Sequence, residues 1–197
     1  MNAIAIHGSS QSSSGRRSPA RLSIAQYYAI SNSGALDDFD RTELLNGEIY
    51  PMNAQYMPHM RVKMALIFAL RDSLLAIRSP LLVGSEGSIE IGSHSAPMPD
   101  VFLYDAPDVA QGAPDGSVKL AIEVADASER FDLGPKKKLY ASGKIPEYWV
   151  AVLRTGVVER FSEPTNGDYQ RRDSFAFGVA VTSVTIAGLA IPADALK

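Results

Sequence analysis

Apolar residues recur at helical spacing over residues 59–77, where most of them lie three or four positions apart. Their positions are Val62, Leu66, Ile67, Leu70, Leu74 and Ile77, with basic side chains, Lys63 among them, placed around the stripe. This pattern predicts a long amphipathic helix. A shorter apolar run over 24–30 follows Ser23, a good N-cap residue, and predicts a second helix.

The turn Asn46-Gly47 separates residues 42–45 from 48–52 and predicts a β-hairpin, because both turn residues tolerate positive φ. Further along, apolar runs bounded by glycine and proline predict strands, and residues 128–142 are expected to form a helix. The strands are expected over residues 81–91, 100–104, 118–124 and 147–153. The last run is almost wholly apolar, which indicates a strand buried on both faces.

A second Asn-Gly turn lies between residues 157–161 and 169–172 and predicts a C-terminal accessory hairpin, with a last short strand over 184–186. The order of elements is a helix, three strands, a helix and a strand. It predicts an α/β fold with a central mixed β-sheet flanked by helices and an N-terminal β-hairpin.

The length of 197 residues and the hydrophobic fraction of 46% suit a single domain, which we expect over residues 21–197. The serine-rich segment 1–20 is expected to be a disordered tail. No run of about 18 apolar residues and no secretory leader is seen, so a cytoplasmic protein that does not enter membranes is expected. The net charge of −3 gives no overall signal of nucleic-acid binding.

Two carboxylates stand where folding alone would not place them. Asp100 begins an apolar run, and Glu123 interrupts another. Burying such a group without a partner costs several kcal/mol, so each must be paired, protonated or bound to a cation. If the two strands are neighbours, both acids and a main-chain carbonyl such as that of Val124 could hold a metal ion. The alternative is that Asp100 only follows a proline in a turn and Glu123 forms an ion pair.

Composition limits the identity of such a metal. The chain has no cysteine, so its ligands must be oxygen or histidine, which favours a hard cation such as Mg²⁺ or Mn²⁺. A metal of this kind activates water for phosphodiester hydrolysis. The sequence carries no phosphate-binding glycine loop, serine-nucleophile motif or zinc motif, which removes the other common hydrolase classes.

Among three consecutive lysines, only Lys136 is expected to face this site. It lies four residues before Tyr140, which marks the inward side of the predicted helix, whereas Lys137 and Lys138 turn away. A lysine leaning over two carboxylates is placed to hold a water or to stabilise negative charge on phosphorus. Pro135 leaves the start of this helix open, and with it the direction of Lys136.

Other acids and histidines are weaker candidates. Glu43 and Glu48 lie on the first hairpin, and either could supply a third carboxylate or simply face solvent. His59 opens the long helix, where a single histidine is more often structural than catalytic.

Several ordered blocks, spread from about residue 22 to the C-terminus, resemble the Uma-two family of restriction-endonuclease-like proteins. This family belongs to the PD-(D/E)xK superfamily and is common in bacteria. The blocks are Glu43-Leu44-Leu45-Asn46-Gly47-Glu48, His59, Pro99-Asp100, Ile122-Glu123-Val124-Ala125-Asp126, Asp132-Leu133-Gly134-Pro135-Lys136, Leu139-Tyr140-Ala141 and Pro146-Glu147-Tyr148-Trp149-Val150.

The resemblance implies a restriction-endonuclease-like fold, a divalent-metal site and nuclease activity on DNA. It assigns Asp100 as the superfamily aspartate and Glu123 as the second metal-binding acid. Ala125 stands where the superfamily usually has its lysine, and Lys136 matches the lysine that this family supplies from the following helix. Glu43 is the better match to the upstream acid.

Two functions follow as hypotheses. The first is a Mg²⁺-dependent endonuclease that cleaves DNA, with Mn²⁺ as a substitute metal. A homodimer would then be expected, since cutting two strands takes two sites. The second is a catalytically silent accessory protein that uses the same fold to bind nucleic acid or protein.

Overall fold

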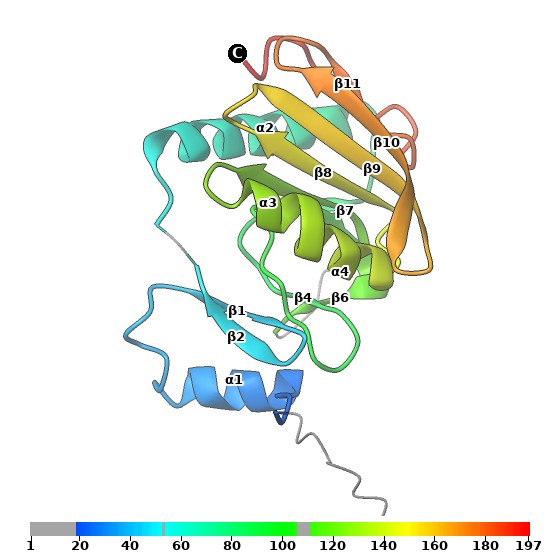
Figure 1. Ribbon diagram of the computed structural model, residues 1–197. Coiled ribbons are helices and arrows are strands. Elements are labelled where there is room, and N and C mark those ends of the chain that lie inside the picture. Colours follow the sequence, from blue (N-terminus) through cyan, green and yellow to red (C-terminus); the bar gives the residue numbers. More distant parts are fainter. Residues whose placement is uncertain (1–18, 53, 106–110) are drawn as a thin grey trace, which may run out of the picture.

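The computed structural model describes residues 19–52, 54–105 and 111–197. A six-stranded mixed sheet in the order β10-β9-β8-β7-β5-β3 forms its centre (Figure 1). Its strands are β3 (Leu82–Gly84), β5 (Val101–Tyr104), β7 (Val118–Ala125), β8 (Glu147–Val152), β9 (Val157–Thr165) and β10 (Asp168–Ala176). Strands β7 and β8 are parallel, and the other neighbouring pairs are antiparallel. The predicted α/β fold with a central mixed sheet is confirmed.

Helices cover both faces of this sheet (Figure 1). Helix α2 (Met57–Ala76) packs on one face, where Leu120, Ile122 and Val124 of β7 join its leucines in one core. The other face is covered by α3 (Glu129–Phe131), η2 (Asp132–Lys136) and α4 (Lys137–Ser142). Because side chains alternate along β7, Glu123 belongs to the face covered by α4. Strand β8 is buried along its whole length, as predicted.

A smaller layer lies beyond one end of the sheet (Figure 1). It contains the hairpin of β1 (Thr42–Leu45) and β2 (Glu48–Pro51), together with α1 (Ile24–Asn32). The predicted turn is confirmed, with φ of 52° at Asn46 and 82° at Gly47. Ser23 caps α1 in a reciprocal capping box with Gln26. The hairpin thereby brings Glu43 toward the start of β5 and the last residues of β7.

The prediction of one strand over residues 81–91 is wrong. The segment forms β3 in the main sheet and then, after Glu86 turns the chain at a φ of 54°, the short strand β4 (Ile89–Glu90). Strand β4 pairs in parallel with β6 (Ala113–Pro114), away from the main sheet. The short 3₁₀ turn η1 (Asp115–Ser117) then leads into β7.

The C-terminal hairpin is part of the core rather than an accessory. Strand β9 pairs with the buried strand β8, so β9 and β10 extend the central sheet. The expected strand over 184–186 is also wrong. Two-residue strands β11 (Val181–Thr182) and β12 (Ala190–Ile191) pair instead, and the loop between them is held by the buried carboxylate of Glu147. That carboxylate accepts hydrogen bonds from Ser183, Thr185 and the main chain.

The helix expected over residues 128–142 is interrupted. Its middle, η2, is a π-helical turn that contains Pro135. Proline cannot donate a main-chain hydrogen bond, so the regular α-helical hydrogen bonding is interrupted at this point. Most of the segment 1–20 lies outside the described residues, and its predicted disorder stays a prediction. In the part of the chain that the structure describes, no helix is both long and apolar enough to cross a membrane.

Candidate active site

Strand register brings Asp100 and Glu123 together. Val101 at the start of β5 pairs with Ile122 of β7, so Asp100 stands opposite Glu123 in the next step of the ladder. Both carboxylates are buried, with 5% and 4% of the residue exposed. The expected pairing of these two strands is therefore seen, and the ligand roles of the two acids stay a prediction.

Three hydrogen-bonding groups fix the carboxylate of Asp100. Its Oδ2 accepts a hydrogen bond of 2.8 Å from the main-chain N–H of Val124 and lies 3.1 Å from Nε2 of His59. Its Oδ1 accepts a 3.0 Å hydrogen bond from Nε2 of Gln55. The structure thus shows the N–H of Val124 at this acid, and a ligand role for the carbonyl of Val124 stays a prediction. His59 contributes by orienting Asp100.

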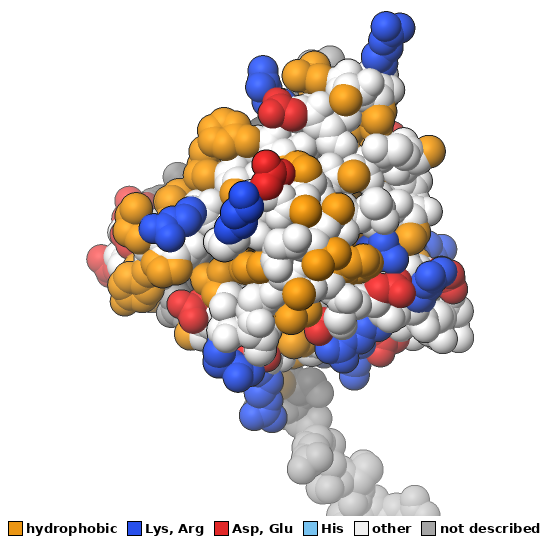
Figure 2. All heavy atoms as spheres, turned by 90° about the horizontal axis from the view of Figure 1, so that it is seen from above, with side chains coloured by type: hydrophobic (Ala, Val, Ile, Leu, Met, Phe, Trp, Pro, Cys, Tyr) orange, Lys and Arg blue, Asp and Glu red, His pale blue; other side chains and the backbone are white. Residues whose placement is uncertain are grey.

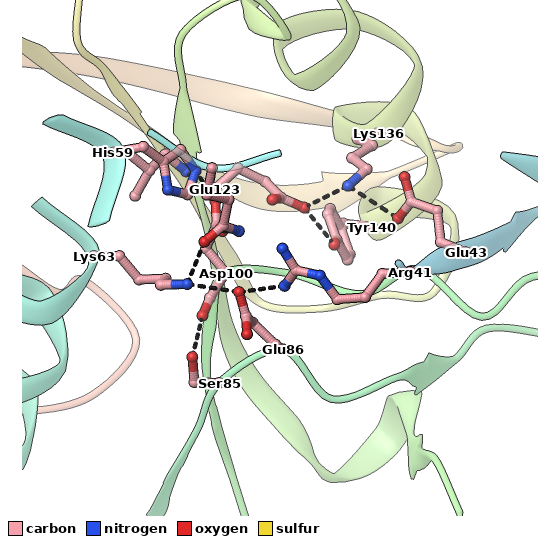
Figure 3. A network of polar contacts seen from close by, with 12 residues as sticks. Arg41, Glu43, His59, Lys63, Ser85, Glu86, Asp100, Glu123, Lys136 and Tyr140 are labelled. Carbon is pink, nitrogen blue, oxygen red and sulfur yellow. Dashed lines mark hydrogen bonds and ion pairs between the residues drawn. The ribbon is translucent and has the colours of Figure 1, made fainter. Parts of the chain in front are cut away.

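The ammonium group of Lys136 lies between two acids (Figure 3). Its Nζ is 3.0 Å from Oε1 of Glu123 and 3.0 Å from Oε2 of Glu43, and the residue is buried. Tyr140, one helical turn further along, donates a 2.8 Å hydrogen bond to the same Oε1 of Glu123. Glu43 also accepts a hydrogen bond from the main-chain N–H of Met98. The expected inward direction of Lys136 holds, although it comes from a π-helical turn.

The remaining candidates point elsewhere. Glu48 is exposed and accepts a hydrogen bond from Tyr50 on its own strand. Glu43 is therefore the hairpin acid that reaches the cluster. Lys138 is exposed, and Lys137 pairs with an aspartate of β10. Both lysines turn away from the two acids, as expected.

Negative charge exceeds positive charge inside this cluster. Burial raises the pKa of Glu123 well above its usual range despite Lys136, with Asp132, Asp100 and Glu43 adding repulsion. Burial also acts against the charged form of Lys136, but Glu123, Glu43 and Asp132 together hold its pKa above the usual value. The lysine is thus a protonated donor, and at least one neighbouring acid favours its neutral form.

Asp132 is an acid of this cluster whose role was not anticipated from the sequence. It is 3% exposed, and burial raises its pKa from 3.8 to about 6 against the opposing effect of Lys136. It begins the π-helical turn, four residues before Lys136. The available signal was this spacing, because residues four apart in a helical segment share a face.

Asp132 predicts a measurable pH dependence of stability. Its folded pKa exceeds its unfolded value, so its stabilising contribution is full below about pH 4 and is lost as pH rises through about 6. An asparagine does not ionise, so the Asp132→Asn variant does not lose stability in this way. We expect the free energy of unfolding of the variant, relative to that of the wild type, to rise by about 1–3 kcal/mol between pH 4 and pH 7.

Urea unfolding in EDTA at several pH values measures this difference. Asp126→Asn is the control, because Asp126 is exposed a few residues earlier. A difference between Asp132→Asn and the wild type that stays constant with pH would contradict the assignment.

A second polar network joins Asp100 from the side of α2 (Figure 3). Gln55 donates to Asp100 and accepts a hydrogen bond from Lys63, which also pairs with Glu86 at 2.6 Å. Arg41 pairs with the same oxygen of Glu86. Lys63 was expected on the outer side of its helix, and it is instead 3% exposed. The missed signal was its position three residues before Leu66, in phase with the apolar stripe.

The donor set suits a hard divalent cation that keeps several waters. Among the described residues, no three His, Asp or Glu side chains gather closely enough to hold a metal. Two carboxylates are present, and no described residue donates a hydrogen bond to Oε2 of Glu123. Magnesium is commonly bound through one or two carboxylates with water in its other positions. The excess negative charge of the cluster also favours a cation.

Comparisons with solved structures agree with this fold. One match is the crystal structure of "a putative nuclease belonging to DUF820 from Anabaena variabilis ATCC 29413". The two chains are 15% identical and superpose with a TM-score of 0.57, over 72% of this chain and 80% of that one. Among functionally curated proteins, none matches this chain.

A family comparison covers most of the sequence. Residues 24–194 match the model of the Uma2 (Uma-two) family, which is described as "Putative restriction endonuclease". This match includes each acid and lysine of the site. The chain belongs to the Uma2 family of restriction-endonuclease-like proteins.

Proposed function

We propose that this protein is a Mg²⁺-dependent endonuclease that hydrolyses phosphodiester bonds in DNA, with Mn²⁺ as a substitute metal. The observation that carries the proposal is the buried pair Asp100 and Glu123 on adjacent strands, with Lys136 hydrogen-bonded to Glu123. The description of the Uma2 family and of the Anabaena protein points to the same class of activity.

Asp100, Glu123 and the carbonyl of Val124 would hold the metal. The bound ion would polarise a phosphoryl oxygen and lower the pKa of a water molecule. Lys136 has a raised pKa, so it stays protonated and donates hydrogen bonds. It therefore orients the attacking water and stabilises charge on the phosphorane, rather than accepting a proton. Glu43 forms the second ion pair with the ammonium group of Lys136.

Nicking of supercoiled plasmid DNA tests this function. We expect open-circular plasmid in Mg²⁺ or Mn²⁺ and none in EDTA. Without a metal ion, the two carboxylates leave the negative charge of the phosphate without a counter-charge. Parallel reactions with single-stranded DNA and with RNA define the substrate. A pure, folded protein that leaves all these substrates intact would favour the alternative, a silent accessory protein that binds nucleic acid or protein.

A homodimer is part of the proposal. Exposed apolar side chains repeat along one side of α2, three to seven positions apart. They are Met57, Met60, Met64, Phe68 and Leu75. Figure 2 looks onto the end of the molecule that carries α2 and shows hydrophobic side chains lying among scattered charged ones. Sedimentation equilibrium checks this expectation, and a monomer at micromolar concentration contradicts it.

A further inference from the structure

The carboxylate of Glu86 is held by two cations at the edge of the candidate active site. Nζ of Lys63 and Nη1 of Arg41 both pair with its Oε1. Figure 3 shows the two basic side chains reaching Glu86 from opposite sides. Although burial opposes it most strongly, hydrogen bonds from Lys63 and Arg41 hold the pKa of Glu86 below its usual range. The acid is therefore an anion at neutral pH.

This anion lies between a buried cation and solvent. The side chain of Lys63 is 4% exposed, whereas those of Arg41 and Glu86 are 29% and 33% exposed. A charged group arriving from solvent would meet Arg41 and Glu86 first. An anion that replaced Glu86 would take over its contacts with both cations.

The backbone of Glu86 is unusual for a glutamate. Its φ of 54° lies in the left-handed region, which costs a side chain other than glycine or asparagine about 1 kcal/mol. Gly84 and Gly87 lie on either side of it in the sequence. The main-chain N–H of Glu86 donates a hydrogen bond to the carbonyl of Pro99, the residue before Asp100. The chain thus holds an acid beside the candidate metal ligand in a conformation that a glycine would adopt more easily.

The position of this ion cluster is tied to the reaction site. Lys63 donates to Gln55, and Gln55 donates to Asp100, so two hydrogen bonds separate the ammonium group from the proposed metal ligand. The two cations therefore lie close to the place where the scissile phosphate would bind. The protein as a whole carries a net charge of −3, so local cations must supply its phosphate contacts.

We propose that Arg41 and Lys63 bind a backbone phosphate of the nucleic-acid substrate, next to the phosphate that is cleaved, and that Glu86 occupies this phosphate site when no substrate is bound. The identity of the ligand rests on the proposed nuclease function. A carboxylate and a phosphate offer similar anionic oxygens to arginine and lysine. Substrate binding therefore exchanges one anion for another, and Glu86 weakens binding of nucleic acid.

Binding of a fluorescent DNA duplex in EDTA tests this exchange without the proposed cleavage. Glu86→Gln removes the competing charge, so we expect its affinity for DNA to rise about tenfold. Glu163→Gln is the control, because Glu163 is exposed and, like Glu86, has a positive φ, here of 62°. We expect it to change the affinity less than twofold.

Arg41→Gln supplies an independent measurement. We expect weaker DNA binding. The slope of the logarithm of the binding constant against the logarithm of the salt concentration should be shallower by about one, because one phosphate contact is lost. The loss should be larger in the Glu86→Gln background, where Arg41 no longer pairs with an internal acid. Arg41 is partly exposed, so this variant tests the site even if Glu86→Gln does not fold.

The results separate this inference from the proposed function. Unchanged or weaker binding by Glu86→Gln, an Arg41→Gln salt dependence equal to that of the wild type, or no DNA binding by any form would overturn the phosphate site. If Glu86→Gln binds more tightly and the wild type never nicks DNA, the nuclease function fails and the phosphate site stands.

Discussion

Asp100→Asn is expected to lower the rate of metal-dependent DNA nicking by at least about 10²- to 10³-fold. The asparagine can still accept a hydrogen bond from the N–H of Val124, so the start of β5 should keep its place beside β7. It lacks the negative charge that a hard divalent cation requires. Rates of plasmid nicking in Mn²⁺ at several protein concentrations measure the effect.

Asp105→Asn is the control for this variant. Asp105 follows the same strand and pairs with Lys119, and 47% of its side chain is exposed. We expect its nicking rate to stay within twofold of the wild type. Asp100→Asn protein that is folded by circular dichroism and nicks DNA at the wild-type rate would remove Asp100 from the mechanism.

Lys136→Met should lose both activity and stability. The nearly isosteric apolar side chain leaves Glu43, Glu123 and Asp132 buried around a site that has lost its cation. Breaking a buried ion pair from one side costs about 3–5 kcal/mol, and we expect this loss in the free energy of unfolding at pH 8. At pH 5 the loss should be smaller, because burial has raised the pKa values of Glu123 and Asp132 and their neutral forms form more easily.

Urea unfolding at both pH values and nicking assays on the folded variant provide the measurements. Lys138→Met is the matched control, since Lys138 is exposed two residues along the same helical segment. We expect it to change stability by less than about 0.5 kcal/mol. A Lys136→Met variant as stable as the wild type at pH 8, or one with full nicking activity, would contradict the role given to this lysine.

The two central acids could be predicted because they break a local rule. A carboxylate in an apolar strand is visible in the sequence, whereas the pairing of the strands that carry Asp100 and Glu123 is a supposition there and is seen in the structure. Helical phase correctly placed Lys136 on the inward side with Tyr140. The π-helical turn around Pro135 was missed, since proline signals a break without saying how the chain continues.

The second network could not be found in the same way. Arg41, Gln55, Lys63 and Glu86 come from a hairpin, a loop, a helix and a turn, and only the tertiary structure brings them together. Lys63 is expected around the apolar stripe because lysine usually faces solvent, although its helical phase matches that of Leu66 and Leu70. Its burial follows from the partner acid, which lies 23 residues further along the chain.

The sheet extension by β9 and β10 was missed for a different reason. A hairpin signal specifies the pairing of its own two strands and says nothing about a third. The contact of β9 with β8 depends on the edge of β8 that β7 leaves open. The apolar run over residues 147–153 predicts that both faces of β8 are covered, but it carries no information about the strand that pairs with this edge.

A crystal of the protein soaked in Mn²⁺ gives the most direct test of the metal site. We predict an anomalous peak between the carboxylates of Asp100 and Glu123, with Lys136 beside it and no such peak in Asp100→Asn crystals. A manganese ion bound elsewhere while both carboxylates keep their present partners, or no ion at a saturating concentration, would contradict the account.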